Sequence, residues 1–234
     1  MQILELAKKG FRREPVKGAC LEAPSTEILG LRTRKTGFNA DFQERAPIMK
    51  FIRERILNGE RMFGIAAQLG SSLTVEMISN AGFDWTWIDC EHGSGDYSEL
   101  IHQVQVARLG NAPAVVRIPG NNPTTFKRTL DLGAAGIMVP YVNTAAEADQ
   151  AARSMRYQPE GLRGVAGSPP CSGFAQNFDD YYAKANDNLV TMVQIETTEG
   201  VENVDEIAAV PGVDVLFVGP MDLSISMGMI RQFK

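Results

Sequence analysis

Two acidic residues stand at the ends of two short apolar runs near the C-terminus. The runs are VTMVQIE, residues 190–196, and VLFVGPMD, residues 215–222. Both are rich in β-branched residues, which is typical of strands buried on both faces. Because the carboxyl ends of strands carry the chemistry of a parallel α/β barrel, Glu196 and Asp222 predict a shared divalent-metal site. Carboxylate oxygens suit Mg²⁺ or Mn²⁺, which keep positions open for substrate. In the alternative interpretation, each carboxylate caps the helix that follows.

Two more apolar runs carry polar residues of the same kind. The run at 85–89 leads into Asp89, Glu91 and His92, and Arg117 lies inside the run at 114–118. Burying an unpaired charge is very costly, so Arg117 is expected to have an anionic partner. Four strand ends therefore offer an Asp/His pair, an arginine, a glutamate and an aspartate, which could bind a metal-chelated 2-oxo acid. Cys90, beside this group, is better explained as a small buried side chain than as a nucleophile.

Strands and helices that alternate along the chain must position these residues. Apolar runs predict seven strands, at 63–67, 85–89, 114–118, 136–142, 164–167, 190–196 and 214–219, the fifth of them weak. Helical spacing between them predicts helices at 48–56, 74–80, 100–109, 125–132, 145–155 and 201–208. Such alternation implies an α/β fold with parallel strands joined by right-handed crossovers.

Composition excludes several classes of protein. The chain has 234 residues, 44% of them hydrophobic, and a net charge of −5. These values indicate a soluble globular protein without a nucleic-acid-binding surface, and no apolar run is long enough to span a membrane. Three widely spaced cysteines favour a reducing compartment, and we expect a cytoplasmic protein.

Residues 1–45 are basic and lack a steady apolar period. We interpret them as a mobile extension before a domain at 46–234, with an organellar signal as the alternative.

Four segments together resemble the HpcH/HpaI aldolase family of metal-dependent class II pyruvate aldolases. They are GFDWTWIDCEH at 82–92, RYQPEGLRG at 156–164, QIE at 194–196 and VGPMDLS at 218–224. The resemblance runs from about residue 46 to Gly228. It implies a (β/α)₈ TIM barrel of the phosphoenolpyruvate/pyruvate type and an enzyme that cleaves carbon–carbon bonds of 2-oxo acids through a pyruvate enolate. The partners it implies are a small 2-oxo acid and an aldehyde.

The resemblance also implies roles for individual residues. Glu196 and Asp222 match the ligands of Mg²⁺, Mn²⁺ or possibly Co²⁺, and Asp89 and His92 match an acid–base pair. Arg117, Gln194, Gly219 and Met221 match substrate-binding residues around the pyruvate moiety, and Arg117 is also expected to be catalytic. Asp131 matches a supporting residue that helps to position neighbouring groups. Trp87 is expected to bind substrate: this residue is usually aliphatic in bacterial members, and an aromatic residue there resembles the fungal macrophomate synthase branch. Core packing is its alternative role.

The length of the chain leaves three functions open. Residues 47–234 fall short of the ~250 positions of a typical barrel, so we expect a barrel truncated before its eighth strand. The functions are an aldolase, an oxaloacetate decarboxylase or enolate-coupling enzyme of the macrophomate synthase kind, and an inactive fragment. The family forms hexamers through C-terminal helices that this sequence lacks, which puts a homo-oligomer in doubt.

Overall fold

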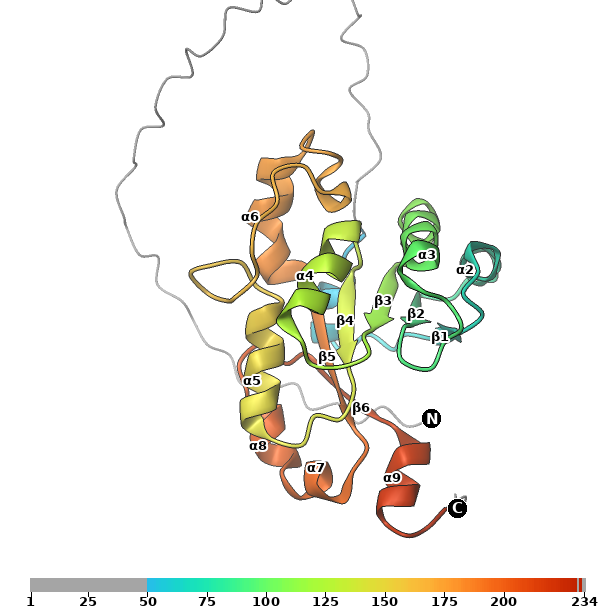
Figure 1. The fold of residues 1–234 in the computed structure, drawn as a ribbon, viewed down its shortest axis with the longest axis vertical. Helices are drawn as coiled ribbons and strands as arrows, with labels where there is room; N and C mark the ends of the chain where they lie inside the picture. The colour runs from blue at the N-terminus through green and yellow to red at the C-terminus, as the bar shows by residue number, and fades with distance from the viewer. Residues whose placement is uncertain (1–49, 231, 233–234) are drawn as a thin grey trace, which may run out of the picture. The chain divides into compact units, whose positions relative to one another are not determined.

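In the described part of the chain, six parallel strands form one sheet, in which every strand pairs with its neighbours in sequence (Figure 1). The computed structural model describes residues 50–230 and Gln232, so the extension expected at 1–45 lies outside the described residues. The strands run in the order β1 (Gly64–Ala67), β2 (Trp85–Asp89), β3 (Ala114–Arg117), β4 (Gly136–Val139), β5 (Val190–Ile195) and β6 (Val215–Val218). The α/β class and the parallel pairing predicted from the sequence are confirmed.

Helices alternate with these strands along the chain. They are α1 (Arg53–Leu57), α2 (Ser72–Asn80), α3 (Tyr97–Leu109), α4 (Pro123–Leu132), α5 (Ala145–Ser154), the 3₁₀ helix η1 (Pro170–Ser172), α6 (Phe178–Asn188), α7 (Thr198–Glu202), α8 (Val204–Ala208) and α9 (Pro220–Ser226). Local chemistry sets several boundaries: Asp96 and Thr144 form capping boxes at the starts of α3 and α5, and Gly133 ends α4 with a φ of 103°. Within the described residues, no helix has the length and apolar character needed to cross a membrane.

The predicted fifth strand at 164–167 is wrong. Residues 164–168 are exposed, and the only sheet-like pairing nearby is an isolated bridge between Tyr157 and Arg163. Two glycines and an exposed Val165 give this segment no apolar side to bury, so it stays a loop. The sheet of the described residues therefore has six strands where the sequence predicted seven.

The two faces of the sheet bury different residues, because successive side chains of a strand point in opposite directions. One face packs under the helices and includes Val116, Ile137 and Val193. The other face carries a smaller apolar cluster that includes Trp85, Val115, Met138, Met192 and Phe217. We call this second side the inner face.

The sheet is open between its first and last strands. Among the described residues, β1 pairs only with β2, and β6 pairs only with β5. Large apolar side chains are exposed near both edges, including Phe63 and Met77 beside β1 and Ile225 and Ile230 in and after α9.

Candidate active site

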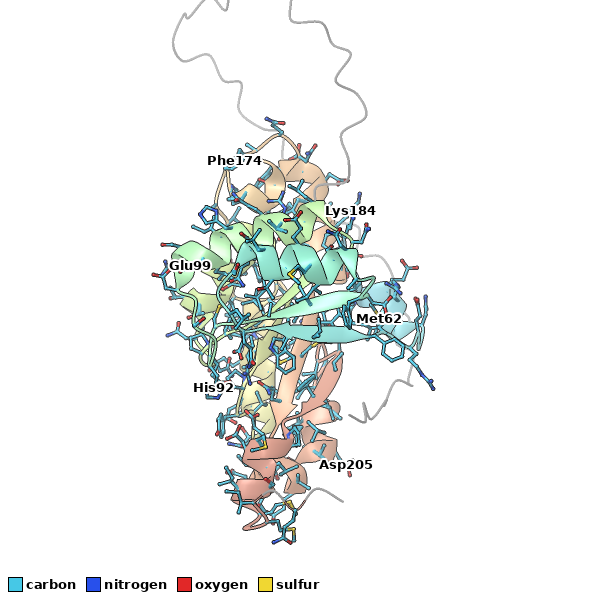
Figure 2. The ribbon with its side chains drawn as sticks, turned by 90° about the vertical axis from the view of Figure 1, so that its right-hand side faces the viewer. Met62, His92, Glu99, Phe174, Lys184 and Asp205 are labelled. Atoms are coloured by element: carbon cyan, nitrogen blue, oxygen red, sulfur yellow. The ribbon has the colours of Figure 1, made fainter. Side chains whose placement is uncertain are left out.

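Strand alternation brings the polar residues of three strand ends to one side of the sheet. Trp85 belongs to the inner face, so Asp89, four residues on, points the same way. Arg117 follows Val115, and Glu196 follows Met192, by the same even spacing. Figure 2 shows His92 at the carboxyl end of the strands, with Met62 at the opposite end. The predicted site therefore lies at the carboxyl ends of the strands, next to the inner apolar cluster. We call this end of the sheet the carboxyl edge.

Arg117 has the anionic partner that its burial requires. Its Nε donates to Asp89 Oδ1 at 2.9 Å, and Nη2 donates to Asp89 Oδ2. Nη1 lies 3.1 Å from Glu91 Oε2, and the guanidinium carbon lies 5.3 Å from the centre of the Trp87 ring. The arginine therefore joins two carboxylates of the β2 end while it rests against an aromatic ring.

The Asp89 carboxylate is saturated with donors. Besides Arg117, it accepts from Gln68 Nε2 at 2.8 Å and from the backbone N–H groups of Glu91 and His92, both at 3.1 Å. Burial by itself would raise the pKa of Asp89. The hydrogen bonds from Arg117, Gln68 and His92 N outweigh that effect and lower the pKa to about 2. Asp89 is thus a fixed anion.

His92 has a different carboxylate neighbour from the one predicted. Asp89 accepts the backbone N–H of His92, whereas the imidazole Nε2 lies 3.8 Å from Glu91 Oε2. The side chain is 61% exposed. The bidentate grip of Arg117 occupies both Asp89 oxygens, so the expected pairing of Asp89 with the His92 ring is absent from the described contacts. His92 remains at the mouth of the site, next to Glu91.

Glu196 is buried and held between backbone and side-chain groups. Its Oε1 accepts from the Tyr141 N–H at 2.8 Å, and its Oε2 accepts from Gln194 Nε2 at 3.2 Å. Gly219 backs this carboxylate closely, because a Cβ at residue 219 would lie 2.2 Å from Oε2. The helix that follows is capped by Thr197, whose Oγ1 accepts from Gly200 N. Glu196 is therefore not the cap of α7.

Asp222 lies in the first turn of α9, where its Oδ1 accepts from the Tyr141 hydroxyl at 3.0 Å. Burial raises the pKa of Glu196 against the hydrogen bond from Tyr141, and the charges of Glu91 and Asp222 raise it further. Burial and the charge of Asp222 likewise act to raise the pKa of Glu91. The charged forms of Glu196 and Glu91 are thus both disfavoured by burial and by the neighbouring carboxylates.

These residues fit a hard divalent cation. The donors are carboxylate oxygens, and a cation would relieve the repulsion between Glu196, Asp222 and Glu91. In the part of the chain that the structure describes, no three His, Cys, Asp or Glu side chains converge as a complete metal site. Glu196 and Asp222 would thus supply two ligands and leave the remaining positions to water and substrate, as is usual for Mg²⁺. The buried Gln194 Oε1 has no hydrogen-bond partner among the described residues and is free to accept one.

The other predicted site residues are spread around this group. Trp87 packs edge-on against Phe217, with ring centres 5.1 Å apart, so it contributes to the inner core, and its Nε1 has no partner in the described part. Met221 is exposed in the first turn of α9. Asp131 lies elsewhere: it forms an ion pair at 2.8 Å with buried Arg163, and no contact of the described residues joins it to the site.

Cys90 faces away from the charged group. It follows Asp89 on the opposite side of the strand and lines a cavity of about 270 Å³ with Tyr97, Ile118 and Arg128. Burial and the charge of Asp89 raise the pKa of the Cys90 thiol to about 11. The thiol therefore stays protonated at neutral pH, in agreement with the prediction that it is not a nucleophile.

Three residues of the site were not assigned a role from the sequence. Glu91 was visible at the strand end, but its contact with Arg117 depends on the turn that follows β2. Gln68 follows β1 and reaches Asp89 across the sheet edge. Tyr141 follows β4 and contacts both predicted metal ligands. The position of each just after a strand was the available signal.

Similarity to known proteins covers the part of the chain that carries these strand ends. The sequence pattern of the HpcH/HpaI aldolase/citrate lyase family matches residues 62–234. The 5-keto-4-deoxy-D-glucarate aldolases of Shigella boydii serotype 18 and Escherichia coli O139:H28 are each 43% identical over 165 residues, which is 70% of this chain and 64% of theirs. The chain thus spans less than two thirds of the length of these curated relatives.

Solved structures share the fold. An HpcH/HpaI aldolase/citrate lyase family protein from Burkholderia cenocepacia J2315 has a TM-score of 0.73 and 38% identity, over 77% of this chain and 73% of its own. Macrophomate synthase has a TM-score of 0.68 and 30% identity, over 76% and 64%. The match across residues 62–234 contains all the strand ends described above, and the chain belongs to the HpcH/HpaI aldolase/citrate lyase family.

Proposed function

We propose that the protein is a metal-dependent carbon–carbon lyase that cleaves 2-oxo acids through a pyruvate enolate. Family membership supports the class of reaction. The observation that carries the proposal is the pair of carboxylates Glu196 and Asp222, joined through Tyr141 at the ends of neighbouring strands. We further propose Mg²⁺ or Mn²⁺ as the ion, with Glu196 and Asp222 as its protein ligands.

The chemistry requires positive charge where the enolate forms. Cleavage of the C3–C4 bond of a 4-hydroxy-2-oxo acid leaves the bonding electrons on the pyruvate fragment as an enolate, while the hydroxyl at C4 gives up its proton and becomes the aldehyde carbonyl. A bound divalent ion would stabilise the enolate charge as a Lewis acid. Arg117 supplies a fixed positive charge beside the same strand ends and would hold the substrate carboxylate, in exchange for its contact with Glu91. Gln194 would orient the substrate through its Oε1, which can accept a hydrogen bond from a substrate hydroxyl. His92, exposed at the mouth, would move the proton.

A metal-supplemented assay tests this function. The purified chain would be freed of metal with a chelator and then supplied with Mg²⁺, Mn²⁺ or Co²⁺ and a panel of hydroxy-oxo acids, with pyruvate release as the readout. Glu196→Gln and Asp222→Asn should each abolish metal-dependent turnover, because each removes a charged ligand. Glu206→Gln, on the exposed side of α8, is the matched control and should keep full activity. Full activity of either ligand variant under limiting metal would remove the site as described.

A second candidate function is decarboxylation of oxaloacetate, with or without coupling of the enolate to an acceptor. It is supported by the likeness to macrophomate synthase and by Trp87, whose ring lies beside Arg117. Carbon dioxide release from oxaloacetate without any dependence on an aldehyde would favour it. Relative catalytic efficiencies on oxaloacetate and on hydroxy-oxo acids would decide between the two, because one enolate chemistry serves both.

We also infer that the sheet corresponds to part of a (β/α)₈ barrel. Its parallel strands follow sequence order, and its polar residues gather at the carboxyl edge, as in such barrels. A cytoplasmic location is part of the same proposal, as is an aldehyde as the second product. An oligomer and an inactive fragment remain predictions, which size-exclusion chromatography and the assay above would test.

A further inference from the structure

Tyr141 has an unusual backbone conformation at the end of β4. Its φ is 51°, in the left-handed region, which non-glycine residues adopt rarely. The residue directly follows Pro140, where the chain leaves the sheet before α5. This conformation has a visible consequence: the Tyr141 N–H points at Glu196 Oε1 and donates to it at 2.8 Å. Non-glycine residues with such backbones concentrate at functional sites.

The side chain of Tyr141 makes a second contact with the site. Its hydroxyl donates to Asp222 Oδ1 at 3.0 Å, although the ring is 47% exposed. Glu196 and Asp222 follow different strands, and no hydrogen bond between described residues joins the two carboxylates directly. Tyr141 therefore bridges them, with its backbone on one and its phenol on the other.

These contacts select the oxygens that remain available. Asp222 Oδ1 is occupied by the phenol, whereas Oδ2 receives no hydrogen bond from any described residue. Glu196 Oε1 is occupied by the Tyr141 N–H, and Oε2 faces Gln194. A carboxylate oxygen that accepts one hydrogen bond keeps a second lone-pair direction, so each group is turned in a defined way but can still bind a cation.

We propose that Tyr141 is a positioning residue, which sets the relative orientation of Glu196 and Asp222 for a divalent cation. The inference rests on the proposed function, which identifies Glu196 and Asp222 as the metal ligands. It adds Tyr141, which is not a ligand itself. Outer groups that hydrogen-bond a ligand fix its orientation, and their loss typically weakens metal binding by roughly 10–100-fold. An exposed ring with a strained backbone and two hydrogen bonds to carboxylates is better explained by this role than by core packing.

The test uses Mn²⁺ alone as the probe, with the full chain and no substrate. Calorimetric titration would measure the affinity, and the electron paramagnetic resonance spectrum would report the symmetry of the bound ion. Tyr141→Phe removes the phenol oxygen but keeps the ring and the N–H, and it should weaken Mn²⁺ binding by about tenfold. Tyr141→Asn tolerates the left-handed backbone but cannot reach Asp222, and it should show the same loss.

A matched control is Tyr182→Phe. Tyr182 is also partly exposed, and its hydroxyl contacts the Gln158 carbonyl oxygen, outside the site. It should leave the affinity for Mn²⁺ unchanged. The thermal midpoint of all three variants, measured without metal, separates a loss of orientation from a loss of fold.

The possible outcomes separate the proposed metal site from the proposed positioning role of Tyr141. If Tyr141→Phe and Tyr141→Asn bind Mn²⁺ like the unaltered chain, while Glu196→Gln and Asp222→Asn lose it, the positioning role is wrong and the metal site stands. If the unaltered chain binds no Mn²⁺, the proposed metal site and the positioning role both fail. Weak binding by both Tyr141 variants, with unchanged thermal midpoints, supports the proposal.

Discussion

Asp89 and Arg117 are paired positions on neighbouring strands, and their side chains meet through two parallel hydrogen bonds on the inner face. A planar guanidinium fits a carboxylate in this bidentate way, and such pairs are stronger than single charged contacts. Sheet register therefore aligns the two positions once the crossover through α3 has brought β2 and β3 side by side. The pair anchors one half of the site.

The Asp89–Arg117 pair should make stability depend on pH in the acid range. The pKa of Asp89 is lowered to about 2 in the folded chain, against about 4 when unfolded. Its contribution to the free energy of unfolding is fully present above pH ~4 and is lost as the pH falls towards 2. Urea unfolding between pH 2 and 6 should show a shallower pH dependence in Asp89→Asn than in the unaltered chain. Glu206→Gln should keep the original slope, and equal slopes in all three proteins would contradict the prediction.

Replacing Arg117 with lysine should lower catalytic efficiency by about tenfold or more, because an ammonium cannot form the same planar contacts. Lysine keeps the positive charge, so the loss would report on geometry. Steady-state kinetics with a 2-oxo acid substrate would measure it. An unchanged efficiency would instead make Arg117 a structural partner of Asp89 and Glu91.

Gly219→Ala should disturb the metal site without unfolding the protein. A Cβ there would lie 2.2 Å from Glu196 Oε2 and 2.9 Å from Glu196 Cβ, so the whole Glu196 side chain must shift. We expect about tenfold weaker Mn²⁺ binding, by analogy with the loss of an orienting contact. Gly167→Ala is the control, because a Cβ at residue 167 meets nothing within 4 Å. Comparable Mn²⁺ affinity in the two variants would show that Glu196 adjusts freely.

Asp131→Asn should lower the free energy of unfolding by up to about 3–5 kcal/mol, since it leaves the buried Arg163 without its charged partner. Asp149→Asn breaks the exposed pair with Arg153 and should cost less than about 0.5 kcal/mol. Mn²⁺ affinity should be unchanged in both, measured by the same titration. A selective loss of Mn²⁺ affinity in Asp131→Asn would restore the supporting role that the resemblance implies.

The central strands were predictable because each buries both faces. The runs at 85–89, 114–118 and 190–196 match β2, β3 and β5 to within one residue, since a doubly buried strand is apolar throughout. Helix α6 escaped prediction because its sequence, FDDYYAKANDN, is mostly polar and only Tyr181 and Ala185 are buried. The segment at 164–167 was mistaken for a strand because a short run that contains glycines has too few apolar residues to show a hydrophobic period.

The strand ends of the site were equally visible, but its hydrogen bonds were not. Glu196 and Asp222 could be found because each carboxylate interrupts an apolar pattern. The choice of Arg117 rather than His92 as the partner of Asp89 depends on strand register and on the exposed turn at His92. The role of Tyr141 depends on a backbone angle, which no spacing of residue types reveals.

The order of the strands has a consequence for how the protein is made. Each strand pairs with the next one in the chain, so a ribosome releases the Asp89–Arg117 pair well before Glu196 and Asp222 are synthesised. An early intermediate would then already contain the Asp89–Arg117 pair at the carboxyl ends of its strands, but it would lack the residues proposed to bind metal. Metal binding at the proposed site would therefore have to wait until Asp222 has been synthesised and β5 and β6 have joined the sheet.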